Sequence, residues 1–416
     1  MRFHQIFIIF ATSAVAADIK FLSDTSLYGP PLEVAHAFYN QYPTGIAVSR
    51  SGRKFTNYPG AVDPENVYNG KNSFFAVGEL TSLTQEATFP NREINSPPGG
   101  AINYTTTPPT GANYPDRLIG VQSVVIDGLD RLWILDTGRV LTTEGLLVQS
   151  SYGGPKIVGV NLTTNEVFQT VLFPQHVAYP NSYIDDLRFD LRPELTESGK
   201  GVAYITDASS EGRSGIITVD LGTGESWRHL NHADAANSDN KMVPFVWGEP
   251  IYGSQGPLPF SYFAAGTNGI TLSPDGETLY FGPFISRHLY SVPTANLRDR
   301  TPTGEIRAQS SILDLGQKGW SDGFESDTNG LVYMGNAEQN AVVAFNPKNG
   351  TVTTLVRDPR INAVDTLAVG EDGYLYFTVN QIHLAAAVMP GTDRRVKPWA
   401  LFRVKLPNGG EKIKLL

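Results

Sequence analysis

Residues 268–276 read Asn-Gly-Ile-Thr-Leu-Ser-Pro-Asp-Gly, and an aromatic run, Leu279-Tyr280-Phe281, follows two residues later. Asp-Gly and Asn-Gly pairs tolerate the positive φ that a tight turn needs, so alternating runs on both sides of such a pair predict an antiparallel hairpin. This stretch therefore predicts two strands joined at residues 275–276.

The same unit recurs along the chain. Two more clear copies cover residues 322–334 and 365–377, and three looser copies begin at Thr44, Ser123 and Asp185. One small sheet cannot bury both of its faces, but sheets stacked around an axis can. Six copies therefore predict an all-β fold, a six-bladed β-propeller of four-stranded antiparallel blades.

The spacing of the copies predicts where the loops lie. Their leading residues are about 79, 62, 83, 54 and 43 positions apart, against about 40 to 50 for a minimal blade. The surplus falls in two connections, residues 92–118 and 231–266. The second connection carries an apolar and aromatic set that predicts either a pocket wall or packing of the loop on itself: Met242, Phe245, Trp247, Tyr252, Phe260, Tyr262 and Phe263.

Composition limits the classes of function. The chain has 416 residues, 41% of them hydrophobic, and we expect one propeller domain over residues 18–416. The net charge is −9 and no basic run occurs, so nucleic acid is not an expected partner. Cysteine is absent, which excludes disulfides and thiol nucleophiles. No G-x-S-x-G elbow, P-loop or dinucleotide fingerprint is present.

The N-terminus predicts export. An apolar stretch over residues 6–15 ends in Ala14-Val15-Ala16-Ala17, as in a secretory signal peptide over residues 1–17. The stretch is too short to span a bilayer, so we expect a secreted monomer without a membrane span. Three acceptor motifs predict a glycoprotein, at Asn103, Asn161 and Asn349.

Several segments resemble the major royal jelly protein and Yellow family. They are residues 130–138, 182–187, 279–294 and 331–347. The resemblance implies a six-bladed propeller, secretion and a small-molecule pocket at one mouth of the channel. It also implies roles that range from binding of biogenic amines or sterols to proposed isomerisation of dopachrome. Animal members usually carry cysteines, so this cysteine-free chain suggests a microbial or fungal branch.

The leading residues of the six copies predict a ring around the channel mouth, because the innermost strand of each blade runs along the axis. The ring consists of Thr44, Ser123, Asp185, Asn268, Asp322 and Asp365. Converging carboxylates raise one another's pKa or recruit a hard cation such as Ca²⁺. No other cofactor is expected. The alternative is that these side chains only cap the starts of strands.

The ring also resembles the metal site of gluconolactonase propellers, with Asp185, Asn268 and Asp322 as the metal ligands. Those enzymes present a glutamate in the first blade, where this chain has Thr44. We expect the ring and Trp247 to bind a small aromatic or polycyclic molecule. Whether the protein also isomerises or cyclises it, binds it without catalysis, or is a metal-dependent lactonase remains open, as do the catalytic residues. His176 and His232 are general-base candidates.

Overall fold

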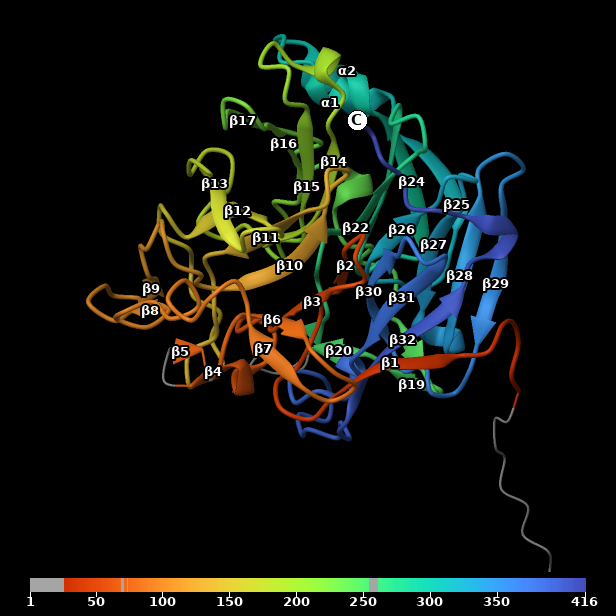
Figure 1. Cartoon of the computed structure of the whole chain (residues 1–416), viewed down its shortest axis with the longest axis horizontal. Coiled ribbons are helices and arrows are strands. Elements are labelled where there is room, and N and C mark those ends of the chain that lie inside the picture. Colours follow the sequence, from red (N-terminus) through yellow and green to blue (C-terminus); the bar gives the residue numbers. More distant parts are fainter. Residues whose placement is uncertain (1–25, 69–70, 73, 254–260) are drawn as a thin grey trace, which may run out of the picture.

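Six four-stranded antiparallel sheets surround a central axis in the computed structural model (Figure 1). The structure describes residues 26–68, 71–72, 74–253 and 261–416, so the predicted signal peptide lies outside the described residues. The prediction of a six-bladed propeller is confirmed. The first three blades, from the inner to the outer strand, are β2 (Ala47–Val48), β3 (Lys54–Asn57), β6 (Val77–Leu80) and β7 (Glu86–Thr88); β10 (Val121–Ile126), β11 (Arg131–Thr137), β12 (Pro155–Asn161) and β13 (Glu166–Leu172); and β14 (Ile184–Asp190), β15 (Val202–Asp207), β16 (Gly215–Asp220) and β17 (Ser226–His229).

The remaining blades follow the same order, except that the sixth takes its outer strand from the N-terminus. They are β22 (Thr267–Leu272), β23 (Thr278–Pro283), β24 (His288–Pro293) and β25 (Leu313–Gln317); β26 (Phe324–Ser326), β27 (Val332–Asn336), β28 (Ala341–Asn346) and β29 (Thr351–Arg357); and β30 (Val364–Val369), β31 (Tyr374–Val379), β32 (Trp399–Lys405) and β1 (Glu33–Phe38).

The strand β1 closes the ring by pairing with β32, with Phe38 opposite Trp399. An N-terminal segment was expected to pair with the last blade, near residues 19–22, which lie outside the described residues. His36 of β1 also bonds to the first blade, through Ser82 O at 2.8 Å and Glu86 Oε1 at 3.1 Å. Closure therefore joins the first and last blades.

Burial falls from the inner strands to the outer ones. Every residue of β14 and β22 is buried, whereas β13 exposes four of its seven residues. The core lies between blades, where large side chains from neighbouring sheets meet. Trp133 of the second blade, for example, stacks on Phe189 of the third at 5.1 Å between ring centroids. Such contacts fix the stacking of the blades.

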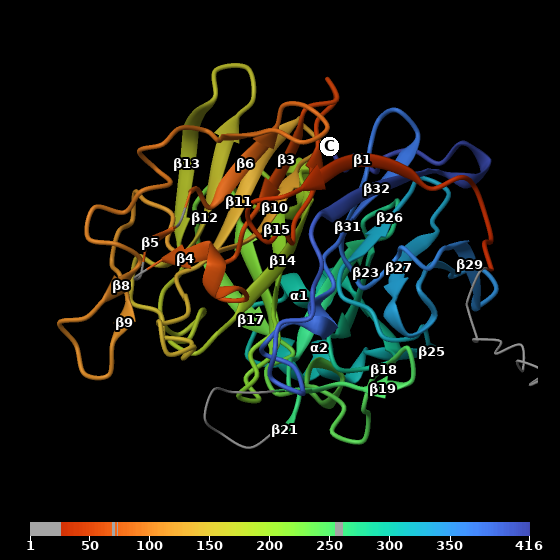
Figure 2. The same cartoon turned by 90° about the horizontal axis from the view of Figure 1, so that it is seen from below.

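The long connections lie on one face, which we call the loop face. They contain short hairpins: β4 (Val67–Tyr68) with β5 (Lys71–Asn72), β8 (Ile102–Asn103) with β9 (Thr110–Gly111), β18 (Phe245–Val246) with β19 (Glu249–Pro250), and β20 (Tyr252–Gly253) with β21 (Ser261–Tyr262). Figure 2 shows β18, β19 and β21 on the side opposite the C-terminus. The helices α1 (Thr294–Arg298) and α2 (Gly304–Ser310) lie between β24 and β25. No helix within the described ranges is both long and apolar enough to cross a membrane.

Candidate binding site at the channel mouth

The inner strands begin within three residues of the predicted positions, which confirms the repeat alignment. Asp185, Asn268 and Asp365 are the second residues of β14, β22 and β30. Ser123 is the third residue of β10, Asp322 lies two residues before β26, and Thr44 lies three residues before β2.

A β-bulge places the ring side chains in four of the six inner strands. The register shifts at residues 121–123 in β10, 184–187 in β14, 267–269 in β22 and 364–367 in β30. A bulge leaves one residue unpaired and turns its side chain away from the regular alternation. Sequence reasoning missed Gln122, which takes the position in β10 that Asn268 takes in β22. Aligning Gln122-Ser123 with Asp185-Asp186 would have found it.

The bulges bring five of the six predicted ring residues around one cavity of about 10 Å³, and Thr44 is not part of its wall. That volume holds about one water molecule or one metal ion, and it is too small for an aromatic ring. The wall consists of Gln122, Ser123, Asp185, Asp186, Asn268, Asp322, Gly323, Asp365 and Thr366.

Thr44 and Ser123 are held by hydrogen bonds within the protein. Thr44 Oγ1 accepts a bond from Asn57 Nδ2 at 3.0 Å, and its carbonyl accepts one from the Thr378 hydroxyl of the last blade. Ser123 Oγ donates to Asp186 Oδ1 at 3.1 Å. Both residues thus link neighbouring blades, as the strand-capping alternative predicts for part of the ring.

The three ring aspartates have raised pKa values. Burial, followed by repulsion from neighbouring carboxylates, raises the pKa of Asp185 and Asp322 well above the ordinary range. Burial raises the pKa of Asp365 to about 7, although hydrogen bonds from Asn380 and Thr366 oppose the shift. Within the part of the chain that the structure describes, none of the three forms an ion pair. At neutral pH the ring must therefore share protons or attract a cation.

The donor atoms suit a hard cation, because carboxylate and amide oxygens are the ligands that Ca²⁺ prefers. The described residues nevertheless contain no group of three or more histidine, aspartate or glutamate side chains arranged to hold a metal ion. Thr44, in the place of the glutamate of the lactonases, is engaged by Asn57. The side chains as they stand therefore do not form a ready metal site, and no reaction step is derived through a metal.

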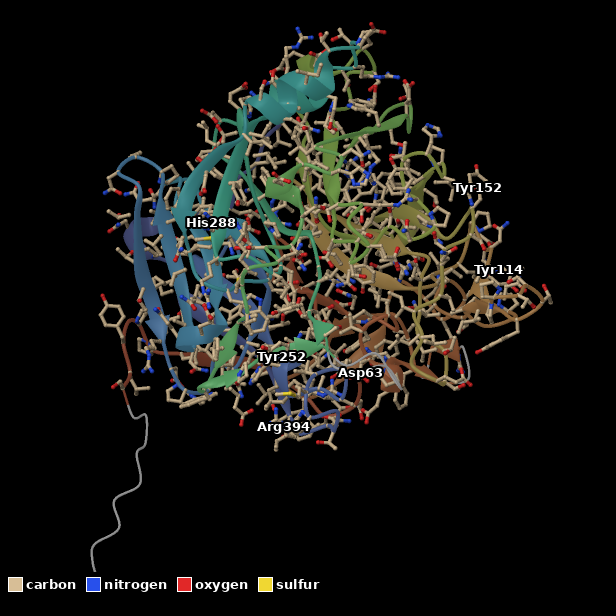
Figure 3. The ribbon with its side chains drawn as sticks, turned by 180° about the vertical axis from the view of Figure 1, so that it is seen from behind. Asp63, Tyr114, Tyr152, Tyr252, His288 and Arg394 are labelled. Atoms are coloured by element: carbon tan, nitrogen blue, oxygen red, sulfur yellow. The ribbon has the colours of Figure 1, made fainter. Side chains whose placement is uncertain are left out.

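The segment around Trp247 covers part of the loop face. Its buried residues Met242, Val246 and Ile251 belong to one apolar cluster with side chains of the fourth, fifth and sixth blades, among them Trp320. Glu249 pairs with Arg394 at 2.9 Å, and Figure 3 looks onto this face.

The aromatic set of this segment does not wall an open pocket as a group. Trp247 lies in the turn between β18 and β19 and is 55% exposed, so the structure does not bring it to the ring. Tyr262 is 61% exposed, and Phe260 lies outside the described residues.

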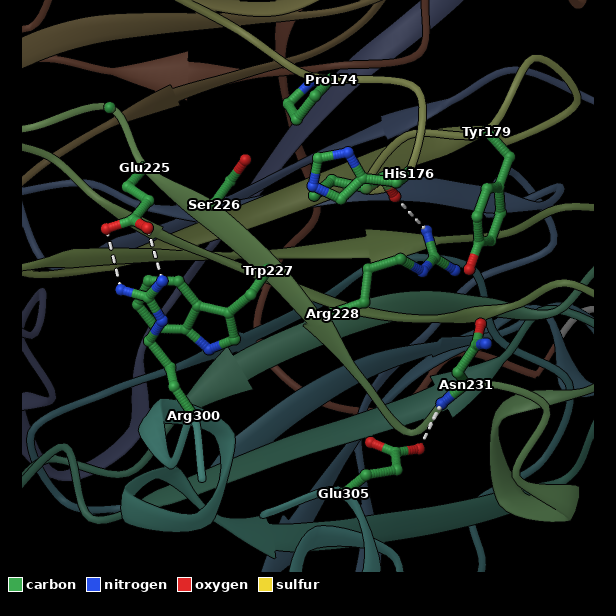
Figure 4. Close-up of a pocket in the computed structure, with 12 residues that line it drawn as sticks. Pro174, His176, Tyr179, Glu225, Ser226, Trp227, Arg228, Asn231, Arg300 and Glu305 are labelled. Carbon is green, nitrogen blue, oxygen red and sulfur yellow. Dashed lines mark hydrogen bonds and ion pairs between the residues drawn. The ribbon is translucent and has the colours of Figure 1, made fainter. Parts of the chain in front are cut away.

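A separate groove of about 630 Å³ lies on the outer rim of the third blade (Figure 4). His176 lines this groove and not the ring. The charged groups of the groove are paired with each other, as in Glu225 with Arg300 at 2.5 Å. His232, the other predicted general base, bonds to Gly212 O at 2.5 Å. The structure therefore brings neither histidine to the carboxylates.

Comparisons with solved structures find the same fold. A luciferin-regenerating enzyme gives a TM-score of 0.50 at 10% identity, covering 93% of this chain and 99% of that chain. The calcium-binding protein regucalcin from Agrobacterium tumefaciens gives 0.47 at 12% identity, covering 92% and 97%. Likeness at such low identity shows the propeller fold alone.

Comparisons of sequence identify relatives. The protein yellow of Drosophila erecta is 27% identical over 245 residues, which is 56% of this chain and 41% of that protein. The chain thus spans about two fifths of the length of that relative. The relatives found are insect proteins, and they give no support to a microbial or fungal origin. The family described as major royal jelly protein matches residues 119–405, well over half of the sequence. The chain therefore belongs to the major royal jelly protein family.

Proposed function

We propose that this protein is a secreted, monomeric propeller that binds a small aromatic molecule through a cationic group at the channel mouth. The observation that carries the proposal is the convergence of Asp185, Asp322 and Asp365 on one ion-sized cavity without an ion pair. A bound cation relieves the mutual repulsion of the carboxylates. The signal-like N-terminus and the family resemblance support secretion.

The size of the cavity divides the ligand into two parts. About 10 Å³ admits an ammonium group or an ion but no ring, so the aromatic body would lie above, toward the loop face. Two phenols are near the ring: burial and then Asp365 raise the pKa of Tyr42, and burial and then Asp185 raise that of Tyr183. Tyr42 Oη is buried without a hydrogen-bond partner, whereas Tyr183 Oη donates to Gln122 at 2.6 Å.

Proton transfer on the bound molecule is a second candidate function. It is favoured by Asp365, whose pKa of about 7 suits a group that both gives and takes a proton near neutral pH. Isomerisation or cyclisation would then use Asp365 as acid and base. The lactonase alternative has less support, because the described residues lack a ready metal group.

A matched pair of ligands tests the binding proposal. 2-Phenylethylamine and 2-phenylethanol share a ring and differ in charge, so calorimetry should show binding of the amine and little of the alcohol. Asp322→Asn keeps the shape but removes a charged acceptor, and we expect about 10- to 100-fold weaker amine binding. Glu197→Gln is the control, because Glu197 is exposed on the loop after β14, at the other end of that strand from Asp185.

Three results would contradict the proposal: no amine binding, equal binding of the alcohol, or an equal effect of Glu197→Gln. Titration with Ca²⁺, with and without a chelator, examines the metal alternative. For the isomerase candidate, Asp365→Asn should reduce turnover by about 10² or more while amine binding is retained.

A further inference from the structure

Arg188 crosses the channel below the ring. It lies on β14 of the third blade, three residues after Asp185, which places it about 10 Å further along the axis. Its Nη1 donates to both oxygens of Asp186 at 3.0 Å, and its Nη2 donates to Phe324 O on β26 of the fifth blade. These blades are separated by the fourth, so the guanidinium passes in front of β22.

Arg188 also balances two carboxylates beneath the ring. It forms ion pairs with Asp186 at 3.0 Å and with Glu325 at 3.8 Å, and it is only 7% exposed. The three ring aspartates have no such partner. Positive charge therefore lies directly below a site that lacks it.

The C-terminal segment closes the channel at the opposite end from the loop face. Leu415 O accepts a bond from Leu191 N of the third blade at 2.9 Å, and Glu411 O accepts one from Thr328 N of the fifth at 2.9 Å. Lys414 pairs with Glu371 of the sixth blade at 2.9 Å. The buried Lys412 lies among carboxylates that include Glu325. The segment thus crosses between blades on the far side of Arg188.

We infer that Arg188 is the floor of the binding site and determines its specificity for charge and depth. It stops a cation at the ring, and its own charge limits how tightly the ring holds that cation. This inference rests on the proposed binding of a cation at the ring. Because the C-terminal segment closes the other end, a ligand would enter and leave through the loop face alone.

Replacement of Arg188 separates this role from a structural one. Arg188→Met removes a positive charge and leaves Asp186 and Glu325 unpaired, so the Tm should fall while affinity for 2-phenylethylamine and for Ca²⁺ rises about tenfold or more. A purely structural residue would lower both. Arg192→Met is the control: Arg192 pairs with Asp190 at 2.7 Å beyond the other end of the strand, and its loss should lower the Tm without a gain in affinity.

Glu325→Gln provides an independent test if Arg188→Met does not fold. It leaves Arg188 with surplus positive charge, so cation affinity should fall about threefold or more with little change in Tm. Unchanged or parallel effects in both variants would overturn the inference. If the wild-type protein binds neither probe, the proposed function fails, yet Arg188→Met should still gain stabilisation by Ca²⁺. Absence of that gain would overturn the role of Arg188 itself.

Discussion

Replacing Asp365 with Asn should make the protein more stable at alkaline pH and leave its stability unchanged at acidic pH. Asp365 is 6% exposed, and its Oδ2 accepts a hydrogen bond from Asn380 at 2.6 Å. An asparagine keeps this bond through its carbonyl oxygen, and its amide can donate to the Thr366 hydroxyl. The variant therefore imitates the protonated aspartic acid.

The magnitude follows from the pKa of Asp365, which is about 7 in the folded protein and about 3.9 in an unfolded chain. Since the folded value is the higher one, the stability of the wild-type protein is complete below about pH 4 and is lost as the pH rises through 7. Three units correspond to about 4 kcal/mol. Proton sharing among the three ring carboxyls reduces the difference, and we expect at least about 2 kcal/mol at pH 8.

The assay is urea unfolding of both proteins between pH 4 and pH 8, with a chelator present so that no cation masks the repulsion. The difference in free energy of unfolding should be near zero at pH 4 and should grow with pH. Glu197→Gln should show no such trend. A pH-independent difference, or a variant less stable than the wild-type protein at pH 8, would refute the reasoning about the ring.

Three further predictions concern ring closure, inner-strand packing and export. His36→Ala should cost about 2 to 3 kcal/mol in urea unfolding, because a buried side chain with two hydrogen bonds is lost between the first and last blades; a neutral effect would contradict its role in closure. Gly269→Ala should cost at least about 2 kcal/mol, since the added Cβ would lie 2.5 Å from the Asp322 carbonyl oxygen, and wild-type stability would show that the strands can separate there. Mass spectrometry of protein secreted by eukaryotic cells should find a glycan that Asn349→Gln removes, as Asn349 is exposed in a turn; an unmodified Asn349 would contradict this site.

The repeat pattern was sufficient for the architecture because each blade is built from local signals. Turn dipeptides such as Asp275-Gly276 and the aromatic strands after them lie within about ten residues of each other. The positions of Asp185, Asn268 and Asp365 followed from the same pattern, because equivalent residues of a repeat take equivalent places around the axis. Their approach to one cavity was therefore predictable.

The bulges were not predictable from alternation. A bulge shifts the register by one residue, and its position depends on how two strands pair rather than on either strand alone. For this reason Gln122 was missed and Ser123 stood in its place. The covering of the loop face by the segment around Trp247 was equally hidden, since its contacts join residues of three distant blades.

The sequence by itself determined the number of blades, the ring of polar residues at their inner edges and the family resemblance, because all of these are repeated or local patterns. Only the tertiary structure decided the size of the cavity and the charge of its surroundings. Arg188 meets Phe324 across 136 positions of the chain, and such a contact depends on the closure of the whole ring. The electrostatics of the candidate site are for the same reason a property of the assembled propeller.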